Sequence, residues 1–383
     1  MSQSSDVVVI DIGSKCISAY CAERLSDDNF AVKNSCEIEY SGYADGDWLK
    51  PEEILPSIGK LIEKIERGSG KIKTIHIGVP AQFCTVRTVY DKIVFPKPRR
   101  VTPTDIREFI EANDPFPESP FTRIHVDSVY YMNDRGERTH SPIGTLTSFL
   151  KAQLSYIGAS TDFISFLRQG LIRRGIKTVR FMQSEYVAAL NLFSEEERES
   201  GVILADIGYL ATSVLYIGGD ALLDLKTFSL GGGIIPMGLC TALNLPYDVA
   251  SSLAAKINLG YKDEGDYTLR YDTDTYVYPV EEINSMAKDC IGCIVSYIRK
   301  AISGFRFETS PYATIYLTGG GFSEIRCARD YIAKCFARTV EIVQPSTPNF
   351  EKPYYSTAVG LIKRALLIEK GERFGFFKKL FGI

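Results

Sequence analysis

The most informative pattern in the chain is an apolar run ending in an acidic residue and a glycine, which occurs twice. Residues 7–13 read Val-Val-Val-Ile-Asp-Ile-Gly, and residues 202–208 read Val-Ile-Leu-Ala-Asp-Ile-Gly. Each run has the length and the β-branched composition of a buried strand. Alternating apolar residues follow at 16–20 and 214–217, which predicts a hairpin partner rather than a helix. Two such hairpins, each with an aspartate at its turn, predict a duplicated α/β core whose halves face each other.

A third predicted strand, at residues 314–318, ends in a triple glycine at 319–321. Ser323 and Glu324 stand where the capping residues of a following helix belong. Glycine lets backbone N–H groups approach a ligand closely, and the N-terminus of a helix favours anions. A purely structural turn from strand to helix needs only one glycine. The run of three therefore favours a ligand-binding loop.

The residues between these landmarks predict two insertions. Residues 86–165 carry proline-rich stretches at 96–100 and 114–120, which flank a predicted amphipathic helix at 104–112 and precede a predicted strand at 124–131. The second insertion, at residues 226–304, begins near another triple glycine at 231–233. Its remaining pattern predicts one helix near 237–256 and another near 280–304.

Composition and charge narrow the class of protein. Of the 383 residues, 45% are hydrophobic and 24% are charged, which excludes a disordered or fibrous protein. The net charge of −3 provides no global basic field, so we expect no nucleic-acid partner. No apolar stretch reaches the ~18 residues of a membrane-spanning helix. The N-terminus lacks the basic and apolar regions of a secretion signal, and we expect a cytoplasmic protein.

The nine cysteines agree with that compartment, because an odd number scattered over a long chain indicates reduced thiols. Only Cys290 and Cys293 have the spacing of metal or redox ligands. No second pair accompanies them, so buried thiols are favoured over a zinc or redox site.

The motifs, taken together, resemble those of a known family. The two Asp-Ile-Gly turns and Leu-Thr-Gly-Gly-Gly at 317–321, in this order, resemble the actin-like ATPase superfamily of actins, sugar kinases and chaperone ATPases. Pro-Tyr-Tyr-Ser-Thr-Ala-Val-Gly-Leu at 353–361 and Ser-Glu-Glu-Glu-Arg-Glu-Ser-Gly at 194–201 are similar to segments of FtsA, the family of actin-like bacterial cell-division proteins. Residues 374–381 resemble the membrane-targeting helix of that family. The chain is thereby identified as a divergent member of the FtsA family.

This resemblance implies an α/β fold of the actin-like ATPase type, with a duplicated RNase H-like core and inserted subdomains. The limits that it implies are 1–85 with 166–197 and 348–368 for the first core subdomain, 86–165 for the FtsA-specific insertion, 198–225 with 305–347 for the second core subdomain, 226–304 for the second insertion, and 369–383 for a linker and membrane-targeting helix.

The resemblance also implies ATP and Mg²⁺ in a central cleft, with Asp11 and Asp206 holding Mg²⁺ through water. The cofactor-binding residues implied are Asp11, Gly13, Ser14, Lys15, Asp206, Gly208, Thr212, Lys256, Gly319, Gly320 and Gly321. The C-terminal tail of FtsZ is the implied partner of the second insertion, through Lys288. Further implied partners are other copies of the chain in a filament, membrane lipids and other division proteins, on the inner face of the membrane at the division site.

The C-terminal residues predict an amphipathic helix on their own pattern. Phe374, Phe377 and Phe381 fall on one helical face, and basic residues beside aromatic ones suit an anionic membrane surface. A polar stretch at 369–373 predicts a break from the preceding helix, whereas the alternative is a helix docked on the protein's own core. The residues expected at the membrane are Phe374, Phe376, Phe377, Lys378, Lys379, Leu380 and Phe381.

Several positions depart from the family pattern. Tyr209, Leu210 and Ala211 stand where the family has two glycines and a threonine in its second phosphate loop. A Cβ in such a loop collides with the phosphate or forbids the backbone angle, so weakened triphosphate binding is predicted. Leu253 replaces a glutamate, and Lys288 replaces an arginine, which is not equivalent in a bidentate contact.

We predict at most a weak ATPase, since no residue is convincing as a general base. Gln82, Gln183 and Glu185 qualify only by position, and ordinary surface roles are expected for them. Two alternatives share the fold: a small-molecule kinase, which needs an intact second phosphate loop, and a scaffold of another envelope machine, like PilM of pilus assembly.

Overall fold

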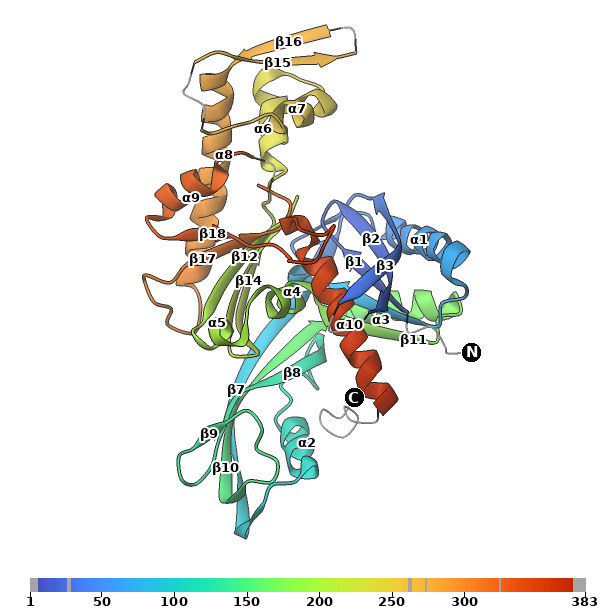
Figure 1. Ribbon diagram of the computed structural model, residues 1–383, viewed down its shortest axis with the longest axis vertical. Coiled ribbons are helices and arrows are strands. Elements are labelled where there is room, and N and C mark those ends of the chain that lie inside the picture. Colours follow the sequence, from blue (N-terminus) through green and yellow to red (C-terminus); the bar gives the residue numbers. More distant parts are fainter. Residues whose placement is uncertain (1–5, 26–28, 261–263, 273, 324, 375–383) are drawn as a thin grey trace.

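The computed structural model describes residues 6–25, 29–260, 264–272, 274–323 and 325–374. Two five-stranded sheets form its middle, and two further parts extend from them in opposite directions (Figure 1). The first core sheet consists, in spatial order, of β11 (Thr178–Gln183), β6 (Thr74–Val79), β1 (Val7–Ile12), β2 (Cys16–Arg24) and β3 (Phe30–Glu39).

The second core sheet repeats this order. It consists of β18 (Val340–Ile342), β17 (Ile315–Thr318), β12 (Val202–Ile207), β13 (Thr212–Gly218) and β14 (Ala221–Phe228). Asp11 lies opposite Ser18 in the first antiparallel hairpin, and Asp206 lies opposite Ser213 in the second. The leading strand of each hairpin also pairs in parallel with β6 or β17. The predicted duplicated α/β core of the actin-like ATPase fold is therefore confirmed.

Helices fill both faces of the first core sheet. They are α1 (Ile54–Ser69) and α3 (Thr161–Arg173) on one face, and α4 (Ser184–Leu192) and α10 (Ser356–Phe374) on the other. Because side chains alternate along a strand, Val8 and Ile10 pack with the first pair, while Val9 packs with the second. Leu204 and Leu215 of the second core sheet join the cluster around α4 and α10. These two helices therefore tie the two sheets together.

The first insertion is a four-stranded antiparallel sheet with one helix. Its spatial order is β7 (Cys84–Arg100), β10 (Leu146–Ser160), β8 (Phe121–Met132) and β9 (Arg138–Thr139). The predicted helix is α2 (Pro103–Ala112), which begins at a capping box between Thr102 and Asp105. Ile106 and Phe109 bury its apolar face. The predicted strand at 124–131 is β8, which is longer at both ends.

The proline-rich stretch at 96–100 lies within β7 and does not interrupt it, although proline usually breaks regular structure. Pro96 and Pro98 lie where the register between β7 and β10 shifts, and no pairing partner is recorded for residues 95–98. β7 is also an edge strand, where a missing N–H costs no ladder bond.

The second insertion has two helices where one was predicted over 237–256. These are α6 (Ile234–Leu243) and α7 (Tyr247–Ala254). Asn244 separates them in the left-handed conformation with φ of 53°, and Pro246 follows it. The predicted helix near 280–304 is α8 (Val280–Ser303), preceded by the hairpin of β15 (Asp266–Tyr271) and β16 (Asp274–Pro279).

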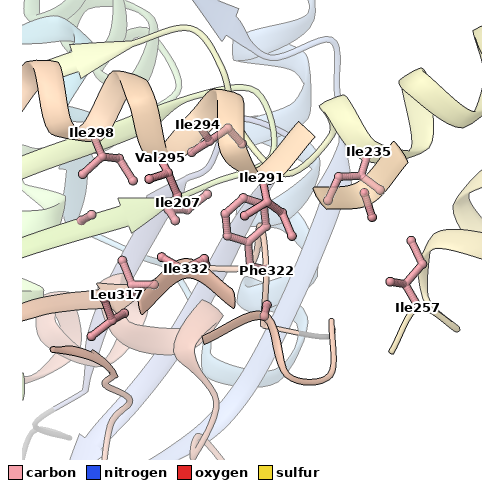
Figure 2. Close-up of a cluster of buried hydrophobic side chains, with 14 of the residues drawn as sticks. Ile207, Ile235, Ile257, Ile291, Ile294, Val295, Ile298, Leu317, Phe322 and Ile332 are labelled. Atoms are coloured by element: carbon pink, nitrogen blue, oxygen red, sulfur yellow. The ribbon is translucent and has the colours of Figure 1, made fainter. Parts of the chain in front are cut away.

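One hydrophobic cluster joins this insertion to the second core sheet. Figure 2 shows Ile291, Ile294 and Ile298 of α8 packed near Ile207 and Leu317, which come from the ends of β12 and β17. Leu253 is fully buried in the same cluster. The leucine at this family-divergent position therefore serves as a core residue.

Two predictions about helix limits were wrong. The helix after residues 319–321 is α9 (Ala328–Phe336), so Ser323 does not cap it, and Glu324 lies outside the described residues. Residues 322–327 of the sequence lie between the glycines and the first residue of that helix. The polar stretch 369–373 does not break α10, which runs to Phe374. Glutamate, lysine and arginine are good helix formers, and a single glycine costs only about 1 kcal/mol.

The remaining elements are short. They are α5 (Glu195–Glu199), β4 (Tyr43–Ala44), β5 (Asp47–Trp48) and the 3₁₀ helices η1 (Pro51–Glu53), η2 (Ala81–Phe83) and η3 (Pro353–Tyr355). Within the described ranges, none of the helices has both the length and the apolar character needed to cross a bilayer.

Candidate functional site

The candidate site lies where the turns of the two core hairpins meet. In the first turn the Gly13 N–H donates to the carbonyl of Cys16 at 2.9 Å, and in the second the Gly208 N–H donates to that of Ala211 at 2.9 Å. The turns touch directly, since the Leu210 N–H donates to the Ser14 hydroxyl oxygen at 3.0 Å. Ser14 is only 6% exposed. A triphosphate between the two turns therefore does not fit this arrangement.

Tyr209 and Leu210 reach across to other parts of the molecule. The Lys15 ammonium lies 5.3 Å from the centre of the Tyr209 ring and 3.3 Å from the Glu39 carboxylate. The Tyr209 hydroxyl forms a hydrogen bond with the Tyr247 hydroxyl on α7, and burial raises the pKa of Tyr209. The second turn thus contacts the first core sheet and the second insertion.

The two glycine runs pack against this turn through their backbones. The Gly232 and Gly233 N–H groups donate to the carbonyls of Gly208 and Tyr209, both at 2.9 Å, and the Gly321 N–H donates to that of Ile207 at 2.7 Å. A Cβ at Gly232 would lie 2.1 Å from the Gly321 carbonyl oxygen. Close packing of the backbone therefore explains why these positions are glycine. The N–H groups already donate hydrogen bonds within the protein.

Three carboxylates lie beneath the turns. Asp11 accepts a hydrogen bond from the Thr357 hydroxyl at 2.6 Å. Glu185 accepts one from the Ala81 N–H at 3.2 Å and another from the Ser213 hydroxyl at 3.1 Å. Its other oxygen accepts from the Gln183 amide. Gln183 is 1% exposed and Glu185 is 7% exposed, so the surface roles expected for them were wrong.

These carboxylates are electrostatically strained. Burial raises the pKa of Asp11 to about 6, although the Thr357 hydrogen bond opposes the shift, and burial raises the pKa of Glu185 to about 6. The pKa of Asp206 lies well above its usual range, first because of burial and then because of the charges of Glu185 and Asp11. The described residues form no group of three such side chains placed to hold a metal directly, so a cation here would be held through water, as Mg²⁺ often is.

Other predicted site residues form hydrogen bonds with partners outside the two turns. The Thr212 hydroxyl donates to the Leu230 carbonyl at 2.7 Å, and the Lys256 ammonium donates to the Thr268 carbonyl on β15 at 2.7 Å. Lys288 is half-buried on α8, where its carbonyl accepts a hydrogen bond from the Tyr331 hydroxyl of α9 at 3.3 Å. Gln82 donates to the Ser229 hydroxyl oxygen at 3.0 Å.

All nine cysteines are free thiols. Cys290 lies with its Sγ 3.8 Å from the Ile234 carbonyl, and Cys293 is exposed on the same helix. In the part of the chain that the structure covers, no group of three or more histidine, cysteine or acidic side chains is placed to hold a metal. Phe374 ends α10, and the other residues expected at the membrane, from Phe376 to Phe381, lie outside the described residues.

No protein-family model matches the sequence, but individual proteins do. The chain is 23% identical to cell division protein FtsA of Neisseria meningitidis serogroup B, over 96% of this chain and 92% of that protein. It is 21% identical to cell division protein FtsA of Bacillus subtilis, over 98% of this chain and 87% of that protein. The chain is a divergent relative of the FtsA proteins.

Solved structures show the same fold. The PilM–PilN type IV pilus biogenesis complex matches with a TM-score of 0.64 at 15% identity, covering 94% of this chain and 98% of that one. MreB 5 of Spiroplasma citri bound to AMPPNP matches with a TM-score of 0.56 at 11% identity, covering 97% of this chain and 98% of that one. This chain therefore shares its actin-like fold with proteins of other systems.

Sequence reasoning underrated Glu185 and did not foresee the role of Thr357. Thr357 stands inside the 353–361 motif that carries the FtsA resemblance, so the motif itself was a usable signal. Glu185 carries no local signal, because its burial depends on the packing of α4 against α10 and the second core sheet.

Proposed function

We propose that this chain is an actin-like cell-division protein that polymerises and tethers FtsZ filaments to the cytoplasmic membrane. The observation that carries the proposal is the similarity to FtsA proteins along almost the whole chain, including both insertions. A similarity confined to the core would support only the fold, since the implied FtsZ partner binds the second insertion. The domain limits predicted above and contacts with other division proteins are parts of the same proposal.

The FtsZ tail is proposed to bind the second insertion beside Lys288. α8 presents this half-buried lysine next to α9, on a helix whose buried face is anchored in the cluster of Figure 2. The ammonium group of a half-buried lysine has fewer conformations to lose on binding, which suits the capture of an acidic peptide. We expect Lys288→Glu to reduce binding of an FtsZ tail peptide at least ~10-fold, the scale of removing one charged anchor.

Lys300→Glu is the matched control, because Lys300 is exposed near the other end of the same helix. Fluorescence anisotropy with a labelled tail peptide measures both variants. Equal weakening by the two substitutions would show that only the net charge of the helix matters. Unchanged binding in Lys288→Glu would place the site elsewhere.

The membrane contact is proposed to be the C-terminal segment from Phe374. Burial of its six apolar side chains in the membrane, at ~1.5 kcal/mol each, contributes at most ~9 kcal/mol of binding free energy. The loss of conformational entropy when ten residues become ordered costs about as much. Basic residues return ~1 kcal/mol each near anionic lipid. The membrane affinity of a single C-terminal segment is therefore marginal. Stable attachment needs several such segments joined in a filament.

Mg-ATP is proposed to bind only weakly. The similar MreB 5 structure contains AMPPNP, and the Asp11 and Asp206 carboxylates suit Mg²⁺ held through water. Against tight binding, the hydrogen bond between Leu210 and Ser14 must break before a phosphate can enter between the turns. This also argues against the small-molecule kinase, which needs an open second phosphate loop.

A scaffold of the PilM type is the second candidate, favoured by the TM-score of 0.64 to the PilM–PilN complex. At 15% identity this likeness supports the fold alone. Pull-down with an FtsZ tail peptide separates the candidates, because only the cell-division protein is expected to retain it.

A further inference from the structure

The two hairpin turns meet through contacts made by Tyr209 and Leu210. We infer that Tyr209 and Leu210 form a latch that holds the central cleft closed without any ligand. The inference deepens the proposed function, because it assigns the closed state of the tether to the protein's own side chains rather than to a nucleotide.

The first part of the latch is the contact of Leu210 with the first core subdomain. Its N–H donates to the buried Ser14 hydroxyl oxygen at 3.0 Å. Its side chain lies against Gly42, where a Cβ would be 2.8 Å from the leucine Cδ1 and 2.3 Å from the Ser14 carbonyl oxygen. Gly42 has a φ of +90°, so glycine is what allows this segment to approach. The polar and the apolar halves of this contact form together.

The second part is Tyr209, which stands at the meeting point of three parts of the molecule. Its ring lies near the Lys15 ammonium, and its hydroxyl bonds to that of Tyr247 on α7. A Cβ at Gly233 would lie 2.8 Å from Cζ of the ring, so the ring fills the space beside the glycine run. Tyr209 thereby links the first core sheet, the second core sheet and the second insertion.

A separate polar bridge closes the cleft beside the latch. Ser229, in the loop after β14, accepts hydrogen bonds from the Asp45 N–H at 2.7 Å and the Gln82 amide at 3.0 Å. Its hydroxyl donates to the Asp45 carboxylate at 2.6 Å. Asp45 and Gln82 belong to the first half of the chain and Ser229 to the second. The two halves of the chain are therefore joined at two places.

A closed cleft lowers the apparent affinity of any ligand that must enter it. A ligand that enters only the open cleft has its apparent affinity reduced by the fraction of molecules that are open. The glycines that the family carries at these positions keep the backbone N–H but lack the leucine side chain beside Gly42 and the tyrosine ring beside Lys15 and Gly233. Replacing Tyr209 and Leu210 by glycine should therefore raise the open fraction and the apparent affinity for a triphosphate.

The test is calorimetric titration of the full chain with Mg-AMPPNP. We expect the double variant Tyr209→Gly/Leu210→Gly to bind at least ~10-fold more tightly than wild type. Tyr312→Gly is the matched control, since Tyr312 is 89% exposed and takes the same chemical change without touching the cleft. Wild type that binds as tightly as the double variant would overturn the latch.

A second measurement does not depend on the double variant folding. Hydrogen exchange of the Leu210 amide in nucleotide-free protein should be slow in wild type and fast in Ser14→Ala, which lacks the acceptor. Rapid exchange in wild type would contradict the latch. Neither readout involves FtsZ or lipid, so failure of the tether proposal remains a separate result.

Discussion

Replacing Asp11 by asparagine should make the protein more stable at neutral pH. The Thr357 hydroxyl donates to Asp11 at 2.6 Å, and an asparagine oxygen can accept the same hydrogen bond. The change therefore removes a charge and keeps the contact. Burial disfavours that charge and raises the pKa of Asp11 from an ordinary value of 3.8 to about 6.

The size and the sign of this stability change follow from the difference between the Asp11 pKa in the folded and in the unfolded protein. A raised carboxyl pKa lowers the free energy of unfolding as pH rises from about 4 to about 6, and the penalty is complete above 6. A shift of about 2 units corresponds to at most ~3 kcal/mol, and partial contact with solvent reduces it to ~1–2 kcal/mol. Asp11→Asn should therefore gain ~1–2 kcal/mol at pH 7.5 and nothing near pH 4.

Urea unfolding of both proteins from pH 4 to pH 7.5, in buffer with EDTA, measures this difference. Asp105→Asn is a control of opposite sign, because the Arg99 guanidinium at 2.6 Å lowers the pKa of Asp105 to about 2. That variant should lose ~1 kcal/mol at neutral pH, and its loss should fade toward pH 2. An Asp11→Asn protein that is less stable by the same amount at every pH would refute the reasoning.

Two further predictions concern the same site and the tail. Gly319→Ala should destabilise by more than ~2 kcal/mol, because its Cβ would lie 2.3 Å from the Asp206 carboxylate at a φ of +89°, whereas Gly136→Ala, with a φ of +79° and open space, should cost about 1 kcal/mol in thermal unfolding. Removing residues 372–383 should leave a folded protein that no longer sediments with anionic liposomes, and sedimentation of the truncated protein would show that the segment is not the anchor.

The sequence was most informative where local pattern and fold agree. Short apolar runs rich in β-branched residues and bounded by a turn favour buried strands, so both hairpins and their aspartates were predictable. The helix predicted over 104–112 was also found, as α2, whose capping contacts between Thr102 and Asp105 are only three residues apart. Such features depend on neighbours in the sequence.

Contacts between distant residues were not predictable. Leu210 and Ser14 are 196 positions apart, and nothing local indicates that a serine in one turn accepts from the other. The burial of Glu185 arises from helices that meet only in the folded chain. These features belong to tertiary packing.

The measurement that tests the central claim most directly is flotation of FtsZ filaments with anionic vesicles. Purified FtsZ is polymerised with vesicles alone, with the full chain, and with the chain lacking residues 372–383. The account predicts that FtsZ floats with the vesicles only when the full chain is present. FtsZ that fails to float with the full chain, or that floats equally well with the truncated chain, would contradict the account.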